Sequence, residues 1–128
     1  PFKDLLAVAD VVSLHCPLTK ATAGLISTAE LKLMKKSAIL VNTARGALVD
    51  EHALKKALQS RIIAGAATDV LSIEPPVDGN VLLDEGIPNL IVTPHVAWIA
   101  RESRQRLIDQ VAGNIKAFLD GKPQNQVV

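Results

Sequence analysis

Cysteine and aromatic residues are scarce in this 128-residue chain, which has one cysteine, two phenylalanines, one tryptophan and no tyrosine. The single Cys16 has no partner for an internal disulfide, which fits a reducing compartment and predicts a cytoplasmic protein. Long apolar runs are also lacking, since none approaches the roughly 20 residues that span a bilayer. These scarcities exclude a disulfide scaffold and disfavour a membrane protein.

An excess of charge of either sign is missing as well. The 14 basic and 13 acidic residues give a net charge of +1 and are scattered along the chain. No basic face is formed for nucleic acid or an anionic membrane, so neither is expected as a partner. With 48% hydrophobic and 21% charged residues, the chain has enough apolar content for the core of one α/β domain at most.

The seven glycines never occur as G-x-G, so the phosphate-cradling fingerprint of a dinucleotide-binding fold is missing from this chain. The chain opens at Pro1, and helical spacing of apolar residues starts at once with Phe2, Leu5 and Leu6. We therefore expect a fragment of a longer protein.

Four short apolar runs alternate with helical patterns. Strands are expected over residues 10–15, 38–42, 62–70 and 90–92, and helices over about 2–9, from 27, from 50 and over about 101–120. This alternation predicts a parallel sheet with right-handed crossovers. Small side chains at 65–67 leave room for a helix or a ligand to approach. Residues 71–89 are expected to form a loop, and a loop of that length inside a compact domain is usually functional or disordered.

Helix starts are marked by capping patterns. Ser27 and Glu30 match a capping box, and Asp50 can cap the following helix. The last helix carries an apolar face and ends before Gly121 and Pro123. The register of the helices is therefore readable from the sequence.

Arg45, Glu74 and His95 each lie just beyond the carboxyl end of a separate expected strand. In an open parallel sheet those ends converge on one crevice, so we expect the three side chains to line one cleft, with Glu74 close to His95. A guanidinium can grip a carboxylate substrate, and a carboxylate beside an imidazole supports proton transfer to a carbonyl oxygen. Taken singly, Arg45 could equally be a surface arginine and His95 a hydrogen-bonded structural residue, and Glu74 would more often be an ordinary loop carboxylate.

Other readings are weaker. A metal site built from His15, Cys16 and His95 is conceivable, but adjacent histidine and cysteine are not a recognised ligand spacing, so no metal is predicted. Cys16 as a nucleophile is equally weak, because cysteines beside strands are usually inert packing. Trp98 could wall a substrate pocket or simply pack where the last helix begins.

With these segments in hand, the chain resembles the carboxyl-terminal part of a D-isomer-specific 2-hydroxyacid dehydrogenase. The resemblance is carried by residues 5–19, by Val-Asn-Thr-Ala-Arg-Gly at 41–46 with Val-Asp-Glu at 49–51, by Ala-Thr-Asp-Val at 67–70, and by Glu-Pro at 74–75 with Thr-Pro-His at 93–95. It covers nearly the whole chain in order and spacing.

The resemblance implies catalytic roles for three residues: Arg45 would bind the substrate carboxylate, His95 would be the acid/base and Glu74 would support His95. It also implies an NAD or NADP cofactor, contacted by residues at matching positions, namely Cys16, Pro17, Thr22, Thr43, Ala44, Arg45, Asp69 and His95. Trp98 would belong to the substrate pocket.

The resemblance further implies a partial Rossmann-type doubly wound sheet over residues 1–100, the second half of a cofactor-binding domain. Residues 101–128 would form a closing helix and tail returning toward a substrate domain that precedes Pro1. The run His-Val-Ala-Trp at 95–98 is most similar to the glycerate dehydrogenase and hydroxypyruvate reductase branch, which implies a small 2-oxo or 2-hydroxy acid substrate. The parent is expected to be a homodimer; the alternative is a non-catalytic, nucleotide-sensing corepressor on the same fold.

Overall fold

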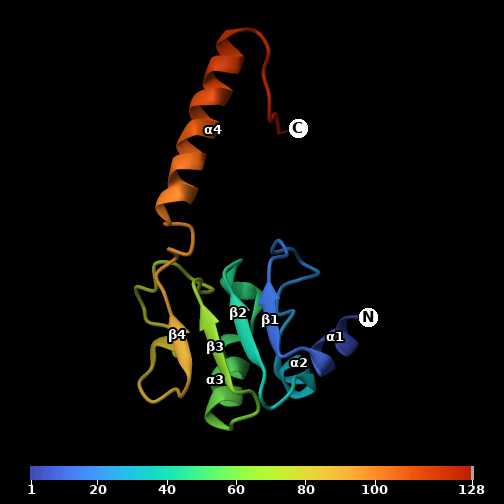
Figure 1. Cartoon of the computed structure of the whole chain (residues 1–128). Coiled ribbons are helices and arrows are strands. Elements are labelled where there is room, and N and C mark those ends of the chain that lie inside the picture. The colour runs from blue at the N-terminus through green and yellow to red at the C-terminus, as the bar shows by residue number, and fades with distance from the viewer. Residues whose placement is uncertain (128) are drawn as a thin grey trace. The chain divides into compact units, whose positions relative to one another are not determined.

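The computed structural model describes residues 1–127, which form two compact units, one over Pro1–His95 and a second that begins at Val96 (Figure 1). The first unit holds every strand and the first three α-helices. The second holds the long helix α4 (Arg101–Leu119).

A four-stranded parallel sheet forms the centre of the first unit. Its strands are β1 (Val11–Leu14), β2 (Ile39–Asn42), β3 (Gly65–Thr68) and β4 (Leu90–Val92), and they lie in the order β1-β2-β3-β4 (Figure 1). All four strands therefore end at the same edge. The predicted parallel α/β architecture is confirmed.

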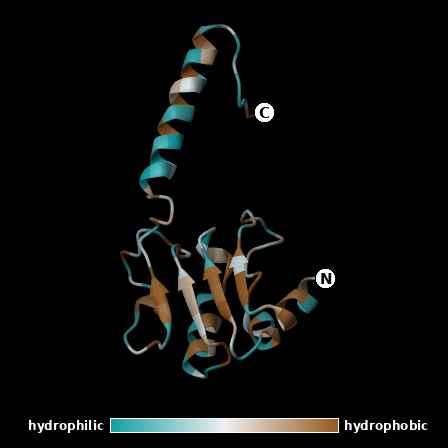
Figure 2. Cartoon of the chain, viewed as in Figure 1, coloured by the Kyte–Doolittle hydropathy of each residue, from teal (hydrophilic) through white to brown (hydrophobic). Residues whose placement is uncertain are grey.

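Three helices, α1 (Phe2–Val8), α2 (Thr28–Leu33) and α3 (Glu51–Gln59), pack on one face of this sheet (Figure 1). Burial alternates along the strands accordingly: Val12, Leu14 and Leu40 are buried, whereas Val11 and Ile39 are exposed. β2 and β4 are coloured hydrophobic over most of their length (Figure 2), as expected of parallel strands that are covered on both sides. The described residues of the first unit cover only one of these faces.

Both predicted helix starts form. The Glu30 carboxylate accepts from the backbone N–H of Ser27 at 3.2 Å and completes the capping box of α2. Asp50 caps α3 by accepting from the backbone N–H of Ala53 at 2.9 Å. A parallel bridge between Ile26 and Val49 joins the two segments that lead into these helices.

The third strand is shorter than predicted. The prediction of a strand over 62–70 is wrong at both ends. At the amino end, Arg61 adopts a φ of 53° and the N–H of Ile62 bonds back to the Ala57 carbonyl at 2.8 Å, so this stretch closes α3 instead. At the carboxyl end, β3 stops at Thr68, whose hydroxyl donates to the Val70 carbonyl at 2.7 Å. Gly65 does permit a close approach, but to the chain entering β4: a Cβ there would lie 3.0 Å from the Asn89 carbonyl oxygen.

The segment between β3 and β4 is a loop, as predicted, but it contains one turn of 3-10 helix. This turn, η2 (Val81–Leu83), is capped by Asn80, whose side-chain oxygen accepts from the N–H of Leu82 at 2.9 Å. Leu82 is buried against the core cluster. A second 3-10 turn, η1 (Gly46–Leu48), follows Arg45.

In the second unit, α4 matches the predicted helix to within one residue. None of its residues is buried, and its apolar side chains are more than half exposed at Leu107, Ile108, Ile115 and Phe118. Hydrophobic and hydrophilic residues alternate along this helix (Figure 2). Among residues 1–127, no helix combines the length and apolar character needed to cross a membrane.

Candidate active site

Arg45, Glu74 and His95 follow three adjacent strands at one edge of the sheet. Arg45 comes three residues after β2 and His95 three residues after β4, while Glu74 lies in the loop that leaves β3. The carboxyl edge of a parallel sheet is where ligands bind in open α/β folds. The strand topology therefore brings the three predicted residues to the expected edge.

Glu74 and His95 form a direct pair. Glu74 Oε2 lies 2.6 Å from His95 Nδ1, and Glu74 Oε1 accepts from the backbone N–H of Leu71 at 2.7 Å. The Glu74 side chain is 33% exposed and the His95 side chain is 50% exposed, so solvent and small molecules can reach the pair. The prediction that Glu74 lies close to His95 is confirmed.

The pKa of Glu74 is lowered from its ordinary value of 4.5 by its surroundings. Desolvation raises this pKa, but the hydrogen bonds from Leu71 and His95 and the charge of His95 lower it by more in sum. Glu74 is therefore a carboxylate near neutral pH, and its Oε2 is a charged acceptor for the imidazole that it contacts.

His95 has a left-handed backbone, with a φ of 57°. Few residues other than glycine adopt this conformation, and where it occurs at a reactive side chain the surrounding structure must hold it in place. Here the N–H of His95 donates to the Asp69 carbonyl at 2.9 Å, which ties His95 to the end of β3. This main-chain hydrogen bond thus fixes the position of the His95 backbone, from which the imidazole extends.

The turn that carries Arg45 is held by Asn42, the buried last residue of β2. Asn42 Nδ2 donates to the Arg45 carbonyl at 3.0 Å, and Asn42 Oδ1 accepts from the N–H of Ala44 at 3.1 Å. Arg45 itself is exposed, and its Nη1 donates to the Ala44 carbonyl at 2.7 Å. The guanidinium therefore projects from a fixed turn into solvent.

Asp69, one residue beyond β3, is only 4% exposed. Thr93 donates a short hydrogen bond from its hydroxyl to Asp69 Oδ1. A carboxylate buried at this edge, with its position set by a neighbouring strand, is a suitable acceptor for a ligand N–H group.

A cavity of about 420 Å³ lies beside the Glu74–His95 pair. Glu74 and His95 line it together with apolar side chains from the loop and from the end of β4. Arg45 is not among its lining residues. The structure thus places Glu74 and His95 at one cavity, and the prediction that Arg45 shares this cleft with them stays a prediction.

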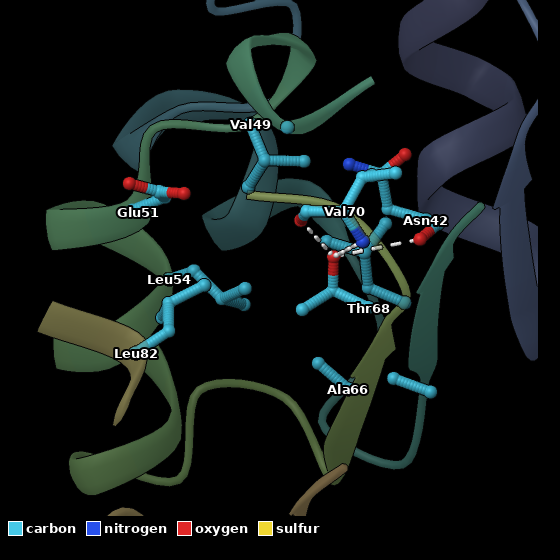
Figure 3. A pocket seen from close by; sticks show the side chains of 11 residues that line it. Asn42, Val49, Glu51, Leu54, Ala66, Thr68, Val70 and Leu82 are labelled. Atoms are coloured by element: carbon cyan, nitrogen blue, oxygen red, sulfur yellow. Dashed lines mark hydrogen bonds between the residues drawn. The ribbon is translucent and has the colours of Figure 1, made fainter. Parts of the chain in front are cut away.

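A second cavity, of about 10 Å³, lies beneath the strand ends between β2, β3 and α3 (Figure 3). Asn42, Thr68 and Leu82 are among its lining side chains, and Thr68 donates to the Val70 carbonyl at 2.7 Å. Such a volume is about that of one water molecule, so it cannot hold a substrate.

The other predicted residues are placed as follows. Cys16 is half-buried after β1, and Thr22 Oγ1 donates to the Pro17 carbonyl at 2.7 Å, which closes the loop there. Thr43 is exposed in the turn before Arg45. Trp98 is 54% exposed and belongs to the second unit. Within residues 1–127, no group of three or more histidine, cysteine or acidic side chains is arranged to hold a metal.

Three structural contributors were missed by the sequence reasoning: Asn42, Glu51 and Thr93. Asn42 had a readable signal, since asparagine two residues before a turn amide is a typical Asx-turn former. Glu51 binds Ser72, 21 residues away, and Thr93 binds Asp69, 24 residues away. Local sequence patterns do not predict contacts between residues so far apart in the chain.

Curated relatives share long stretches of identity with this chain. Glycerate dehydrogenase of Methylorubrum extorquens is 56% identical over 123 residues, which cover 96% of this chain and 39% of that protein. Hydroxypyruvate reductase of Blautia hydrogenotrophica is 43% identical over 124 residues, covering 97% of this chain and 38% of that protein. The chain thus spans less than half the length of these relatives.

Solved structures show the same fold. The NAD-complexed D-isomer specific 2-hydroxyacid dehydrogenase from Lactobacillus delbrueckii ssp. bulgaricus matches with a TM-score of 0.85 and 37% identity, over 99% of this chain and 42% of that one. An acyclic imino acid reductase in complex with NADPH and D-Arg matches with a TM-score of 0.83 and 33% identity, over 100% of this chain and 40% of that one.

The family model for the NAD binding domain of D-isomer specific 2-hydroxyacid dehydrogenases matches residues 1–97, which contain the whole sheet and the Glu74–His95 pair. The expected Rossmann-type fold class is confirmed by the parallel sheet and by its solved neighbours. On this evidence the chain belongs to the D-isomer specific 2-hydroxyacid dehydrogenase family.

Proposed function

We propose that this chain supplies the acid/base pair, the substrate clamp and the nicotinamide-side contacts of an NAD(P)-dependent D-2-hydroxyacid dehydrogenase. The observation that carries the proposal is the 2.6 Å contact between Glu74 and His95 at the carboxyl edge of the sheet. The family to which the chain belongs gives this geometry its chemical context.

His95 is proposed to move the proton. Because Nδ1 is engaged by Glu74, transfer to and from substrate is assigned to Nε2. In the reductive direction His95 donates this proton to the carbonyl oxygen of a 2-oxo acid, and in the oxidative direction it accepts the hydroxyl proton. Glu74 stabilises the imidazolium and fixes the plane of the ring.

Arg45 is proposed to bind the substrate carboxylate. Its guanidinium offers paired N–H donors that match a carboxylate, and the turn held by Asn42 fixes its backbone. A substrate held by its carboxylate presents the adjacent carbonyl carbon in one orientation, which lowers the entropic part of the barrier.

The residues at this edge fit a nicotinamide. The buried Asp69 offers a carboxylate acceptor suited to amide N–H groups, and the exposed Thr43 and the half-buried Ala44 follow β2, the strand that pairs with β3. Cys16, Pro17 and Thr22 are proposed to complete these contacts from the loop after β1. When bound, NAD or NADP would supply or accept the hydride.

The favoured substrates are hydroxypyruvate or glycerate, and glyoxylate. The relatives similar to this chain are named glycerate dehydrogenase, hydroxypyruvate reductase and glyoxylate reductase. The His-Val-Ala-Trp run at 95–98 supports the same branch, with Trp98 proposed in the substrate pocket. The comparisons give no support to the corepressor alternative.

The test is steady-state kinetics of the full-length protein that carries this chain, with hydroxypyruvate, glyoxylate and pyruvate, each with NADH and with NADPH. We expect turnover of at least one of the first two substrates, and a loss of about 10²- to 10⁴-fold in kcat for His95→Ala. His52→Ala, which removes an exposed imidazole from α3, is the matched control. Wild-type rates in His95→Ala would refute the mechanism.

The domain boundaries, the oligomeric state and the cellular compartment are further parts of the proposal. Residues 1–100 would belong to the cofactor-binding domain, and 101–128 would return toward a substrate domain, which would cover the exposed apolar side chains of α4. The parent is proposed to be a cytoplasmic homodimer, for which the single free Cys16 is consistent with a reducing compartment. Light scattering of the full-length protein would measure the oligomeric state.

A further inference from the structure

Glu51, the first residue of α3, holds the loop that carries Glu74. Its Oε1 accepts from the backbone N–H of Ser72 at 2.8 Å, and its Oε2 accepts from the Ser72 hydroxyl at 2.6 Å and from Asn80 Nδ2 at 2.9 Å. Three donors therefore converge on one carboxylate, and all three come from the loop between β3 and β4. Hydrogen bonds to a charged acceptor are among the stronger ones in proteins.

The hydrogen bond from Ser72 to Glu51 lies next to the hydrogen bond from Leu71 that orients Glu74. Leu71 donates its N–H to Glu74 Oε1 at 2.7 Å, and the very next N–H, that of Ser72, donates to Glu51. Two successive amides are thus held by two different carboxylates. A shift of Ser72 moves the donor that positions Glu74, and with it the oxygen that contacts His95.

The same short stretch of backbone is held from a second side by Gly46. A Cβ on Gly46 would lie 1.9 Å from the carbonyl carbon of Leu71 and 2.3 Å from the nitrogen of Ser72. Residues 71 and 72 therefore pack directly against the turn that follows Arg45. Glu51 stabilises this packing, because its hydrogen bonds to Ser72 hold the loop against the start of α3.

We propose that Glu51 is a positioning residue for the catalytic pair: it fixes Ser72, and through Ser72 and Leu71 it holds Glu74 against His95. The role in catalysis rests on the proposed function, whereas the role in placing Glu74 does not. Glu51 has no proposed contact with substrate or cofactor.

A second tether between α3 and the same loop provides a matched control. Lys55 donates from Nζ to Asp84 Oδ2 at 2.5 Å, so it also ties α3 to this loop, but ten residues beyond Glu74. If Glu51 merely stabilised the loop as a whole, Lys55→Ala and Glu51→Ala would have similar effects. If Glu51 positions Glu74, only Glu51→Ala changes the geometry of the Glu74–His95 pair.

The first measurement needs no activity. In the full-length protein, the side-chain carboxyl of Glu74 is titrated by carbon NMR and assigned with Glu74→Gln. Its pKa in the wild type lies below 4.5 because Leu71 and His95 hold the carboxylate. We expect Glu51→Ala to move it toward 4.5 and Lys55→Ala to leave it in place. An unchanged Glu74 pKa in Glu51→Ala would overturn the proposal.

The second measurement is a double-mutant cycle on kcat, at a temperature where all variants are folded. We expect Glu51→Ala to lower kcat by about tenfold with little change in KM, and to have almost no effect in a Glu74→Gln background, since residues that act in one network are non-additive. Glu51→Gln, which keeps one acceptor oxygen, should recover part of the loss. Full additivity of Glu51→Ala and Glu74→Gln would overturn the proposal.

The two failures are distinguishable. If the wild-type protein turned over none of the 2-oxo acids, the proposed function would fail, and the titration of Glu74 would still decide the role of Glu51. If the wild-type protein were active but Glu51→Ala behaved like Lys55→Ala in both measurements, only the positioning role would fail.

Discussion

His95 Nδ1 lies 2.6 Å from Glu74 Oε2, although the two residues are 21 positions apart and follow different strands. The contact joins a histidine whose φ of 57° is stabilised by Asp69 to a glutamate whose other oxygen is held by Leu71. Each partner thus makes a hydrogen bond with the main chain in addition to the bond between them. A preorganised pair of this kind needs little rearrangement when a proton moves.

This pair predicts a specific response to acid. The folded-state pKa of Glu74 is lowered, so the stability that it contributes is present above its unfolded pKa, near 4.5, and is lost as the pH falls through the lower folded pKa. We expect the free-energy difference between wild type and Glu74→Gln to shrink below about pH 4.5. Urea unfolding of both full-length proteins at a series of pH values measures it. A difference that stayed constant down to pH 3 would contradict the lowered pKa.

Substitution of Arg45 should affect binding and turnover together. Removal of a charged, bidentate contact costs roughly 1.5–3 kcal/mol, or about 10- to 150-fold in kcat/KM, and also frees the substrate to rotate. We expect Arg45→Ala to raise KM and to lower kcat, and Arg45→Lys to recover only part of the loss because the planar fork is missing. An Arg45→Lys variant with wild-type kinetics would show that charge alone suffices. Kinetics on hydroxypyruvate give both constants.

Two glycine substitutions should have effects of opposite sign. Gly46→Ala would place a Cβ 1.9 Å from the Leu71 carbonyl carbon, so the loop backbone must move, at a cost of about 1–3 kcal/mol or more. Gly113 lies inside α4, where a Cβ would be 3.7 Å from Gln124 Nε2, an ordinary contact. Gly113→Ala should therefore stabilise the helix by roughly 0.5–1 kcal/mol. Denaturant unfolding of the full-length variants measures both effects, and a neutral Gly46→Ala would refute the close approach.

Periodicity and capping signals in the sequence were sufficient to place most elements. The Ser27–Glu30 capping box and the Asp50 cap form as predicted, because these signals act within three or four residues. The third strand was predicted too long because apolar character continues from Ile62 into β3, while the left-handed Arg61 that turns the chain there has no strong sequence signal. Local apolar content does not distinguish a buried turn from a strand.

For the site, the sequence predicted which edge would hold the reactive residues, since parallel strands end together. It also paired Glu74 with His95 on chemical grounds. It could not predict the Glu51–Ser72 contact, because the path of a loop with few regular hydrogen bonds depends on tertiary packing. The substrate clamp at Arg45 was predicted from its position after β2 and from the family resemblance, and it stays a prediction.

The 128-residue chain by itself should bind nicotinamide cofactors poorly. The pyrophosphate of a dinucleotide normally sits on the amides of a G-x-G turn at a helix amino terminus, and no G-x-G occurs among these residues. Only the proposed nicotinamide-side contacts, such as Asp69, remain, so we expect a Kd weaker than about 1 mM, equivalent to less than roughly 4.1 kcal/mol of binding free energy. Calorimetric titration with NADH and NADPH, after circular dichroism has shown that the isolated chain is folded, measures this. Micromolar affinity would show that the contacts on this half of the site suffice without a glycine-rich turn.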